Sequence, residues 1–359
     1  MSDVLSMPVT AAEEFLADLF ERAGLPSLAS GQMACALVDA DVAGLPSHGL
    51  SQADMYIRRL RLGSVSSAVK PIVVESRAAM AVLDAQGMFG HLAGDAAMQM
   101  AIERSKETGV GVVAVRNSFH FGAAARYTRQ ASARDCIGIA MCNTKPMMPA
   151  PGGLEKLVGN NPLSIALPVS DGPEFVLDMA LSEAALGKIR VYEREGKPLP
   201  PTWAVDRNGQ PTTDAKAAID GMLLPSGGAK GFGLSLAINL MCSLLSQGPG
   251  GDEVAPLYGD LSKPFLCSLL FLAIDIEHFR PTEDFRNEAS AELAKIRGSR
   301  AQVPPRTPGE RSWTKRQNDG GRVDIPRALS ATLNALAEEM GSPERLPSCL
   351  LYTSDAADE

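Results

Sequence analysis

The feature that most constrains the fold is a series of short apolar runs between Ile72 and Asp275. The runs VGVVAV, IGIAM, LSIAL, FVLDM and FLAID alternate with glycine-rich turns and with helical stretches. Short runs rich in β-branched and apolar residues, bounded by turn residues, are typical of buried strands. The middle of the chain therefore predicts an α/β or α+β core.

Both ends of the chain are helical in pattern. Thr10 and Glu13 have the spacing of a capping box before a run with one apolar face, and Gly24 ends that run. Further helices are expected over 31–43 and 52–62. After Phe279 the chain becomes polar and helical again, and an amphipathic segment follows Pro326.

These changes in texture predict four regions. A helical N-terminal segment covers 1–70, a sheet domain covers 71–280, and a helical C-terminal segment covers 281–348. The last eleven residues, CLLYTSDAADE at 349–359, match the translation of a transposon-based sequencing adapter. We interpret them as a non-native tail that takes no part in the fold, and we expect the native C-terminus to differ.

Composition and net charge limit the kinds of molecule that this protein is expected to bind. A chain of 359 residues with 45% hydrophobic content can bury a large core, and a net charge of -8 repels phosphate backbones and anionic lipids. The N-terminus lacks the basic flank and apolar run of a signal peptide, and no stretch approaches the ~20 apolar residues of a membrane span. We expect a cytoplasmic protein that binds neither nucleic acid nor membrane.

The cysteines are scattered, without a CxxC pair. Four of the six lie in apolar segments, which favours buried reduced thiols over disulfides or zinc ligands. No metal site is expected.

Histidine is the side chain best suited to proton transfer near neutral pH, and the chain has four. His48 stands between Ser47, whose hydroxyl can orient a ring nitrogen, and Gly49, which leaves room for a ligand. His120 follows the VGVVAV run at a turn before a small-residue helix, where free backbone N–H groups can bind an anion. Each motif alone fits an ordinary turn better, and we interpret His91 and His278 as structural.

The segment LPSGGAKGFGL at 224–234 resembles a phosphate-binding loop, because glycines allow close approach of the backbone and Lys230 supplies charge. It is not a Walker A loop, since Phe232 stands where that motif has serine or threonine after Gly-Lys. No GxGxxG follows a predicted strand in the first hundred residues, so the Rossmann fingerprint is absent and another dinucleotide scaffold remains open. Asp178 ends a predicted strand, where a carboxylate can bind ribose hydroxyls or simply face solvent.

Six motifs follow one another along the chain: SHG at 47–49, NSFHFG at 117–122, GNNPL at 159–163, FVLDMA at 175–180, LGKI at 186–189 and LLPSGGAKGFGL at 223–234. Taken together and in this order, they resemble the malate/L-lactate dehydrogenase family, which includes sulfolactate, ureidoglycolate and diketogulonate dehydrogenases and cyclic-imine reductases. The resemblance covers residues 10 to 348.

The resemblance implies an α/β, non-Rossmann NAD(P)-binding fold around a mainly antiparallel sheet. Helical N- and C-terminal segments would pack together, and the protein would be a homodimer. It implies hydride transfer between NAD or NADP and C2 of a 2-oxo or 2-hydroxy acid. Two alternatives remain: reduction of cyclic 2-imino acids such as Δ1-pyrroline- or Δ1-piperideine-2-carboxylate, and a catalytically inactive dinucleotide-binding protein.

The resemblance also implies residue roles. His48 would be the proton donor, polarised by Ser47, with Lys188 nearby, and His120 would be the competing acid/base beside the nicotinamide. The dinucleotide would be held by His120, Phe121, Gly122, Ala123, Ala124, Thr144, Asp178, Met179, Ala180, Gly228, Ala229, Lys230 and Gly231.

The chain departs from the family at the substrate carboxylate. Many members have an arginine four residues after the SHG histidine and a threonine before the Asn-Pro pair, and this chain has Gln52 and Asn160 there. Because a bidentate arginine is the usual anchor for a carboxylate, either Lys145 or another cation such as Arg58 or Arg59 substitutes for it, or the substrate differs.

Overall fold

The computed structural model describes residues 4–347. The chain divides into two compact units, one made of residues 1–63 and 312–359 and the other of residues 64–311. The sequence pattern placed these divisions at 70/71 and 280/281. The second division falls later because α9 (Thr282–Arg297) contacts the sheet-containing unit, where Ser170 N donates to Ser290 Oγ at 3.0 Å and Arg286 pairs with Asp135. The 349–359 tail lies outside the described residues.

The first unit joins the N-terminal and C-terminal segments through a small antiparallel sheet. Its strands β1 (Val4–Pro8) and β11 (Arg322–Pro326) pair along their whole length, and neither was expected from the sequence. Each strand alternates exposed and buried residues. The buried ones, Leu5, Met7, Val323 and Ile325, belong to the hydrophobic core of this unit. The helices of this unit are α1 (Val9–Arg22), α2 (Ser27–Val42), α3 (Ala53–Arg61), α10 (Glu310–Asn318) and α11 (Arg327–Glu339).

The first helix starts differently from the expected capping box. α1 begins at Val9 directly after Pro8, whose extended backbone continues β1, and Thr10 lies inside the first turn. No side chain caps this helix; instead Val9 N donates to Gly321 O at 2.9 Å. The predicted capping box is therefore wrong, because a strand leads into the helix and backbone pairing satisfies the first amide.

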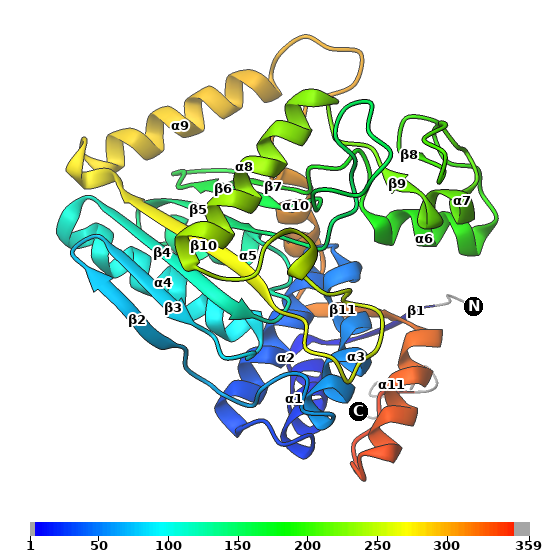
Figure 1. Cartoon of the computed structure of the whole chain (residues 1–359). Coiled ribbons are helices and arrows are strands. Elements are labelled where there is room, and N and C mark those ends of the chain that lie inside the picture. Colours follow the sequence, from blue (N-terminus) through cyan, green and yellow to red (C-terminus); the bar gives the residue numbers. More distant parts are fainter. Residues whose placement is uncertain (1–3, 348–359) are drawn as a thin grey trace, which may run out of the picture. The chain divides into compact units, whose positions relative to one another are not determined.

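In the second unit, seven of the described strands form one sheet in the order β2-β3-β4-β10-β5-β6-β7 (Figure 1). The β3/β4 pair is parallel and the other neighbouring pairs are antiparallel, which confirms the mainly antiparallel, non-Rossmann sheet. The five predicted apolar runs are β4, β5, β6, β7 and β10. The bounds are β2 (Ile72–Arg77), β3 (Met80–Asp84), β4 (Val110–Ser118), β5 (Cys136–Cys142), β6 (Leu163–Leu167), β7 (Phe175–Met179) and β10 (Cys267–Asp275).

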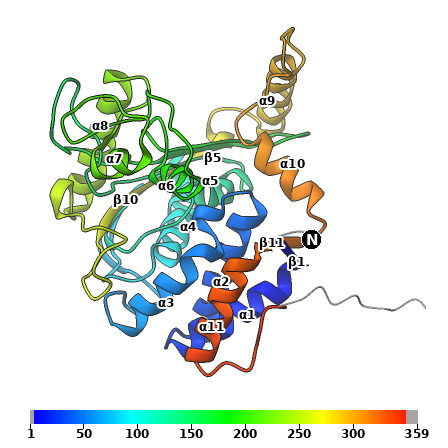
Figure 2. The ribbon, with the colours of Figure 1, turned by 90° about the vertical axis from the view of Figure 1, so that its right-hand side faces the viewer.

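Helices cover both faces of this sheet (Figure 2). On one face, α4 (Gly90–Thr108) and α5 (Ala125–Ser132) pack on the side of Phe271, and Gly111 and Gly138 let them approach, because a Cβ at either position would collide with Ala101 O or Ala131 Cβ. On the other face, α8 (Ala229–Ser246) packs Ile238 and Cys242 against Leu270, the neighbour of Phe271. Leu270 and Phe271 face opposite sides of the sheet because successive side chains of a strand point to opposite faces.

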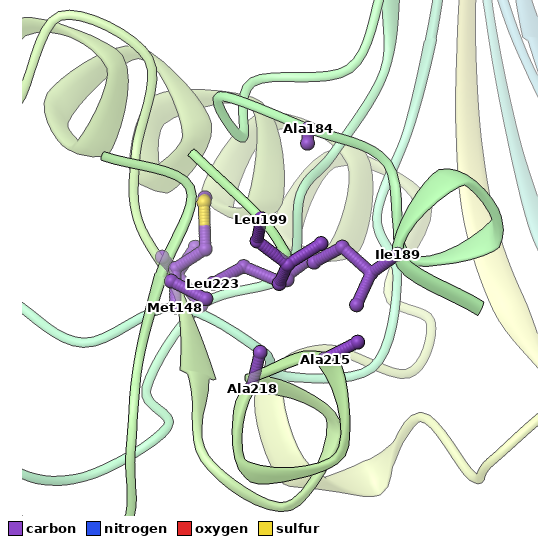
Figure 3. Packing of buried hydrophobic residues seen from close by; sticks show 9 residues of the cluster. Met148, Ala184, Ile189, Leu199, Ala215, Ala218 and Leu223 are labelled. Carbon is purple, nitrogen blue, oxygen red and sulfur yellow. The ribbon is translucent and has the colours of Figure 1, made fainter. Parts of the chain in front are cut away.

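A smaller lobe of the second unit has its own core. It contains α6 (Leu186–Glu195), α7 (Ala215–Asp220), β8 (Ala204–Val205) and β9 (Met222–Leu223). Figure 3 shows the side chains of Met148, Ile189, Leu199 and Leu223 meeting in this core. The lobe thereby fixes the segments on either side of Lys188 and of the glycine-rich loop.

Among the described helices, α8 is long and apolar enough to cross a membrane, which the sequence analysis did not anticipate. This criterion considers only length and composition, and core helices of soluble proteins also meet it. In this structure, one side of α8 packs on β10, β4 and β5.

Candidate active site

Buried aromatic side chains hold the NSFHFG loop after β4. Phe119 and Phe121 are fully buried, and the half-buried His120 lies between them. Phe119 contacts Phe89 and Phe265 edge-on, and Phe121 stacks on Tyr127 at a centroid distance of 5.3 Å. Because both neighbours of His120 are anchored, the backbone that carries this imidazole has little freedom.

The same loop is packed against the start of α4 with no room for side chains. A Cβ on Gly90 would lie 2.2 Å from Phe119 O, and a Cβ on Gly122, whose φ is +71°, would lie 2.4 Å from Nε2 of the buried His91. Tyr127 Oη also donates to the carbonyl of Gly90 at 3.3 Å. His91 is thus packed against the loop as part of its support.

Asp178, at the end of β7, is bonded to the other end of that loop. Its Oδ2 accepts from Ala125 N at 2.8 Å, at the first residue of α5. The position suits a carboxylate, because the N-terminus of a helix carries partial positive charge. Protein atoms crowd the carboxyl although solvent still reaches it, and this desolvation raises the pKa of Asp178 to about 6 despite the bond from Ala125.

Thr144 follows β5 and is held by the two asparagines of GNNPL. Its N donates to Asn161 Oδ1 at 2.8 Å, and its hydroxyl lies 3.0 Å from Asn160 Oδ1. Asn161 is fully buried and also donates from Nδ2 to Ser235 O on α8 at 2.8 Å. A Cβ on Gly159 would lie 2.2 Å from Thr144 Oγ1. The sequence analysis missed Asn161, although the Asn-Asn pair was a visible signal.

The glycine-rich loop lies beside the segment that follows β7. Ser226 N donates to Leu181 O at 2.9 Å, and Leu181 N donates to Asn160 O at 2.8 Å. Gly227 and Gly228 adopt φ values of +64° and +63°, and Gly231 packs so closely on Ser226 O that a Cβ would lie 2.1 Å from it. Residues 227–230 are exposed at the N-terminus of α8, where backbone amides can bind a phosphate.

Hydrogen bonds therefore link segments in or next to the predicted motifs of the second unit. Ala125 links to Asp178, Asn160 accepts from both Thr144 and Leu181, and Leu181 links to the glycine-rich loop. The segments that carry the predicted cofactor contacts are thus held together by these hydrogen bonds and by the backbone that joins Asp178 to Leu181.

The two predicted lysines are exposed in the same unit. Lys188 lies on α6, with Nζ 4.5 Å from the centroid of the Trp203 ring. Lys145 directly follows Thr144. Burial, together with the positive charge of Lys145, lowers the pKa of Lys156. Lys145 and Lys156 are therefore near enough for their charges to interact.

The SHG motif lies in the first unit. Ser47 Oγ and His48 Nδ1 hydrogen-bond at 3.0 Å, and burial lowers the pKa of His48. Gln52 is buried, and its Nε2 donates to Ser47 O at 2.7 Å. The amide group expected to meet a substrate carboxylate thus bonds the turn that carries His48.

The alternative cations of the first unit are also engaged there. Arg58 pairs with Asp54 at 2.8 Å and with Glu339 at 2.9 Å, and the Arg59 side chain is fully buried. Among the described residues, no group of three His, Cys, Asp or Glu side chains could hold a metal ion.

Comparison with known proteins agrees with this geometry. The profile of the family described as "Malate/L-lactate dehydrogenase" matches residues 7–334. An L-sulfolactate dehydrogenase of Methanocaldococcus jannaschii is 36% identical over 337 residues, 92% of this chain and 95% of that protein. A malate dehydrogenase of Pyrococcus horikoshii is 35% identical over 304 residues, 82% of this chain and 83% of that protein.

The fold is shared as well. The solved structure of the sulfolactate dehydrogenase from Methanocaldococcus jannaschii superimposes with a TM-score of 0.88 at 33% identity, covering 94% of this chain and 98% of that one. With a matching profile over most of its length, relatives of this similarity and the same sheet, the chain belongs to the malate/L-lactate dehydrogenase family.

Proposed function

We propose that this dehydrogenase transfers a hydride between NAD(P) and C2 of a 2-hydroxy acid that carries a second acid group, as malate and sulfolactate do. The observation that carries the proposal is that hydrogen bonds, together with the backbone from Asp178 to Leu181, hold the segment after the His120 loop, Thr144 and the glycine-rich loop to one another. The relatives named malate and sulfolactate dehydrogenases support the substrate class.

The residues of this network fit a dinucleotide. Residues 227–230 offer exposed backbone at a helix N-terminus for the pyrophosphate, and Asp178 offers an accessible carboxylate for ribose hydroxyls. Gly122, Ala123 and Ala124 add little side-chain bulk beside His120. Two relatives are named as using NAD(+) and NADP(+), respectively, so both cofactors are candidates.

When bound, the nicotinamide would accept or supply the hydride. For oxidation, His48 would accept the proton of the C2 hydroxyl, because its lowered pKa favours the neutral imidazole and Ser47 is bonded to Nδ1. For reduction, the protonated ring would return that proton. His120 remains the competing acid/base, and Lys188 stays a proposed member of the site.

Lys145 and Lys156 support a substrate with two acid groups. Lys145 is exposed next to Thr144, and its charge contributes to the lowered pKa of Lys156. A pair of ammonium groups favours a dianion over a monoanion such as lactate. Asn160, which accepts from Thr144 at 3.0 Å, would place a neutral amide near the same substrate.

We further propose that the protein is a cytoplasmic homodimer and that α8 contributes to the interface. A row of large apolar side chains on α8 is exposed: Leu234, Leu236, Leu240, Met241, Leu244 and Leu245. Exposed apolar surface of this extent marks an interaction site. Cys142, Cys242 and Cys267 are buried and form no disulfide, which fits a reducing compartment.

The test combines turnover with binding. Malate, sulfolactate, lactate and ureidoglycolate are offered with NAD(+) and NADP(+), and Δ1-piperideine-2-carboxylate and Δ1-pyrroline-2-carboxylate with the reduced cofactors. We expect the highest kcat/KM with a dianionic hydroxy acid. Faster turnover of a cyclic imine would establish the alternative reductase. Quenching of NAD(P)H fluorescence by binding without any turnover would identify an inactive dinucleotide-binding protein.

A further inference from the structure

The turn that carries Ser47 and His48 is bounded by the C-terminal end of α2. Gly44, at a φ of +77°, reverses the chain after this helix. Two short 3-10 turns follow, η1 (Pro46–His48) and η2 (Leu50–Gln52), with Gly49 between them. The buried carboxyl of Asp41, from the last turn of α2, reaches the point where these two turns meet.

Two contacts define that position. Leu50 N donates to Asp41 Oδ2 at 2.6 Å, and a Cβ on Gly49 would lie 2.0 Å from the same oxygen. Leu50 begins a 3-10 turn, so its amide has no acceptor within that turn. The carboxylate therefore fixes both residues that follow His48, and it requires glycine at the first of them.

Other bonds close the turn around the histidine. Gln52 Nε2 donates to Ser47 O at 2.7 Å, and Ser51 Oγ donates to Pro46 O at 2.6 Å. These two bonds hold the backbone just before His48, and the bond between Ser47 Oγ and His48 Nδ1 holds the imidazole ring itself. The Asp41 bond ties the turn back to the long helix α2.

We propose that Asp41 is a positioning residue that sets the orientation of His48 for proton transfer. This inference rests on the proposed function, in which His48 exchanges the proton of the substrate hydroxyl. Asp41 acts through the backbone of Gly49 and Leu50 and does not touch the substrate itself.

The position of Asp41 lowers the free energy of unfolding, and a residue kept at such a position is expected to have a functional role. A carboxylate near the C-terminal end of a helix faces the negative end of the helix dipole, and its burial adds a desolvation cost. The cation whose charge acts on it is Lys315 of α10, and this ammonium is itself bonded to Asp319 at 2.7 Å. The neighbouring acid of α2, Asp39, pairs with Arg316 of α10.

Burial raises the pKa of Asp41 to about 6, against the opposing effects of the Leu50 amide and Lys315. The carboxylate form, which is the stronger acceptor for the amide, therefore predominates above that pH. The groups that share its surroundings are His48 in the turn, Lys315 and Asp319 on the side of α10, and the Asp39–Arg316 pair. Protonation of Asp41 weakens the tie to Leu50 and should appear as an acid limb in the pH profile.

The test uses Asp41→Leu, which removes the acceptor, and Asp41→Asn, which keeps an acceptor oxygen but removes the charge. Asp18→Asn, at a half-buried acid of α1 that pairs with Arg22, is the matched control. The readouts are kcat and KM with malate or sulfolactate, the dissociation constant of NAD(P)H, and the imidazole NMR resonances of His48, assigned by their loss in His48→Gln.

For Asp41→Leu we expect kcat to fall about tenfold or more, since small displacements of a reacting group cost up to about 10²-fold. NAD(P)H affinity should be unchanged and the His48 resonances should shift. Asp41→Asn should keep kcat within about threefold above pH 8 but lose the ionisation step that burial places at about 6. Asp18→Asn should change none of these readouts.

The proposal is overturned if Asp41→Leu folds and leaves both kcat and the His48 resonances unchanged. If Asp41→Leu does not fold, Asp41→Asn decides: an unaltered pH dependence of the His48 resonances in this variant would equally overturn the proposal. If the unmodified protein oxidises no hydroxy acid, the proposed function fails, while the NMR comparison still tests whether Asp41 positions His48.

Discussion

The two candidate acid/base histidines, one in each compact unit, are held in different ways. The turn with His48 is held by polar side chains, through the bonds of Asp41, Gln52 and Ser47. The loop with His120 is held by the burial of Phe119 and Phe121 and by glycines that admit no side chain. Hydrogen bonds respond to protonation, whereas aromatic packing does not. The first support should therefore be adjustable by pH, and the second should be rigid.

The largest expected effect comes from removing the imidazoles themselves. His48→Ala should lower kcat by about 10²-fold or more with little change in NAD(P)H affinity, because positioned acid/base catalysis contributes about 10²–10⁴-fold. His120→Ala should weaken NAD(P)H binding as well as turnover. Steady-state kinetics and fluorescence titration of both variants measure this difference.

If His120→Ala alone abolishes turnover while His48→Ala has a mild effect, His120 rather than His48 is the acid/base group. Asp178→Asn serves as a reference for lost cofactor affinity, since Asp178 belongs to the proposed cofactor network.

The rigidity of the His120 loop is tested by Gly90→Ala. The added Cβ would meet Phe119 O at 2.2 Å, and the backbone oxygen cannot move aside cheaply. We expect the free energy of unfolding to fall by about 1–3 kcal/mol, the usual cost of overpacking. Urea denaturation measures it, and Gly233→Ala in α8, where the Cβ meets nothing within 4 Å, is the control. Equal stability of the two variants would contradict a tightly packed loop.

The polar support of His48 is tested more mildly by Gln52. Gln52→Met removes the bond to Ser47 O with little change in volume and should lower the free energy of unfolding by about 1 kcal/mol. Gln52→Arg should reduce kcat/KM, although the family pattern suggests a gain, because guanidinium must enter a buried site already bonded to the turn. A rise in kcat/KM with Arg would instead place this position against the substrate carboxylate.

The smallest expected effect is on the pH dependence of the free energy of unfolding. One residue of each compact unit, Asp41 in the first and Asp178 in the second, should contribute to it. The pKa values of Asp41 and Asp178 are both raised from 3.8 to about 6. In this window the folded state binds more protons than the unfolded state, so the free energy of unfolding falls as the pH rises from about 4 to about 6. For the solvent-reached Asp178 we expect less than about 1 kcal/mol.

Asp41→Asn and Asp178→Asn should each flatten this slope in urea titrations. A slope that persists in the double variant would assign the pH dependence to other groups.

Much of the sheet could be predicted because several of its strands are continuous apolar runs, as in VGVVAV and FVLDM. β1 and β11 could not be predicted, because each pairs with a partner more than 300 residues away in the chain. Motif order identified the family and the His120 and Asp178 regions. The support by Asp41 was invisible, because it depends on the reversal at Gly44 that returns the chain to α2.

The pairing of β1 with β11 has a consequence for synthesis of the protein. Val4–Pro8 leaves the ribosome about 300 residues before Arg322–Pro326, so at about 5–20 residues per second it waits for tens of seconds without its partner. The unit of residues 64–311 is continuous in the chain and can fold during that interval. Lys315 also arrives late, so the surroundings of Asp41 and the His48 turn are completed last. The surroundings of His48, the proposed proton-transfer group, should therefore be completed only after α10 has been made, later than the sheet.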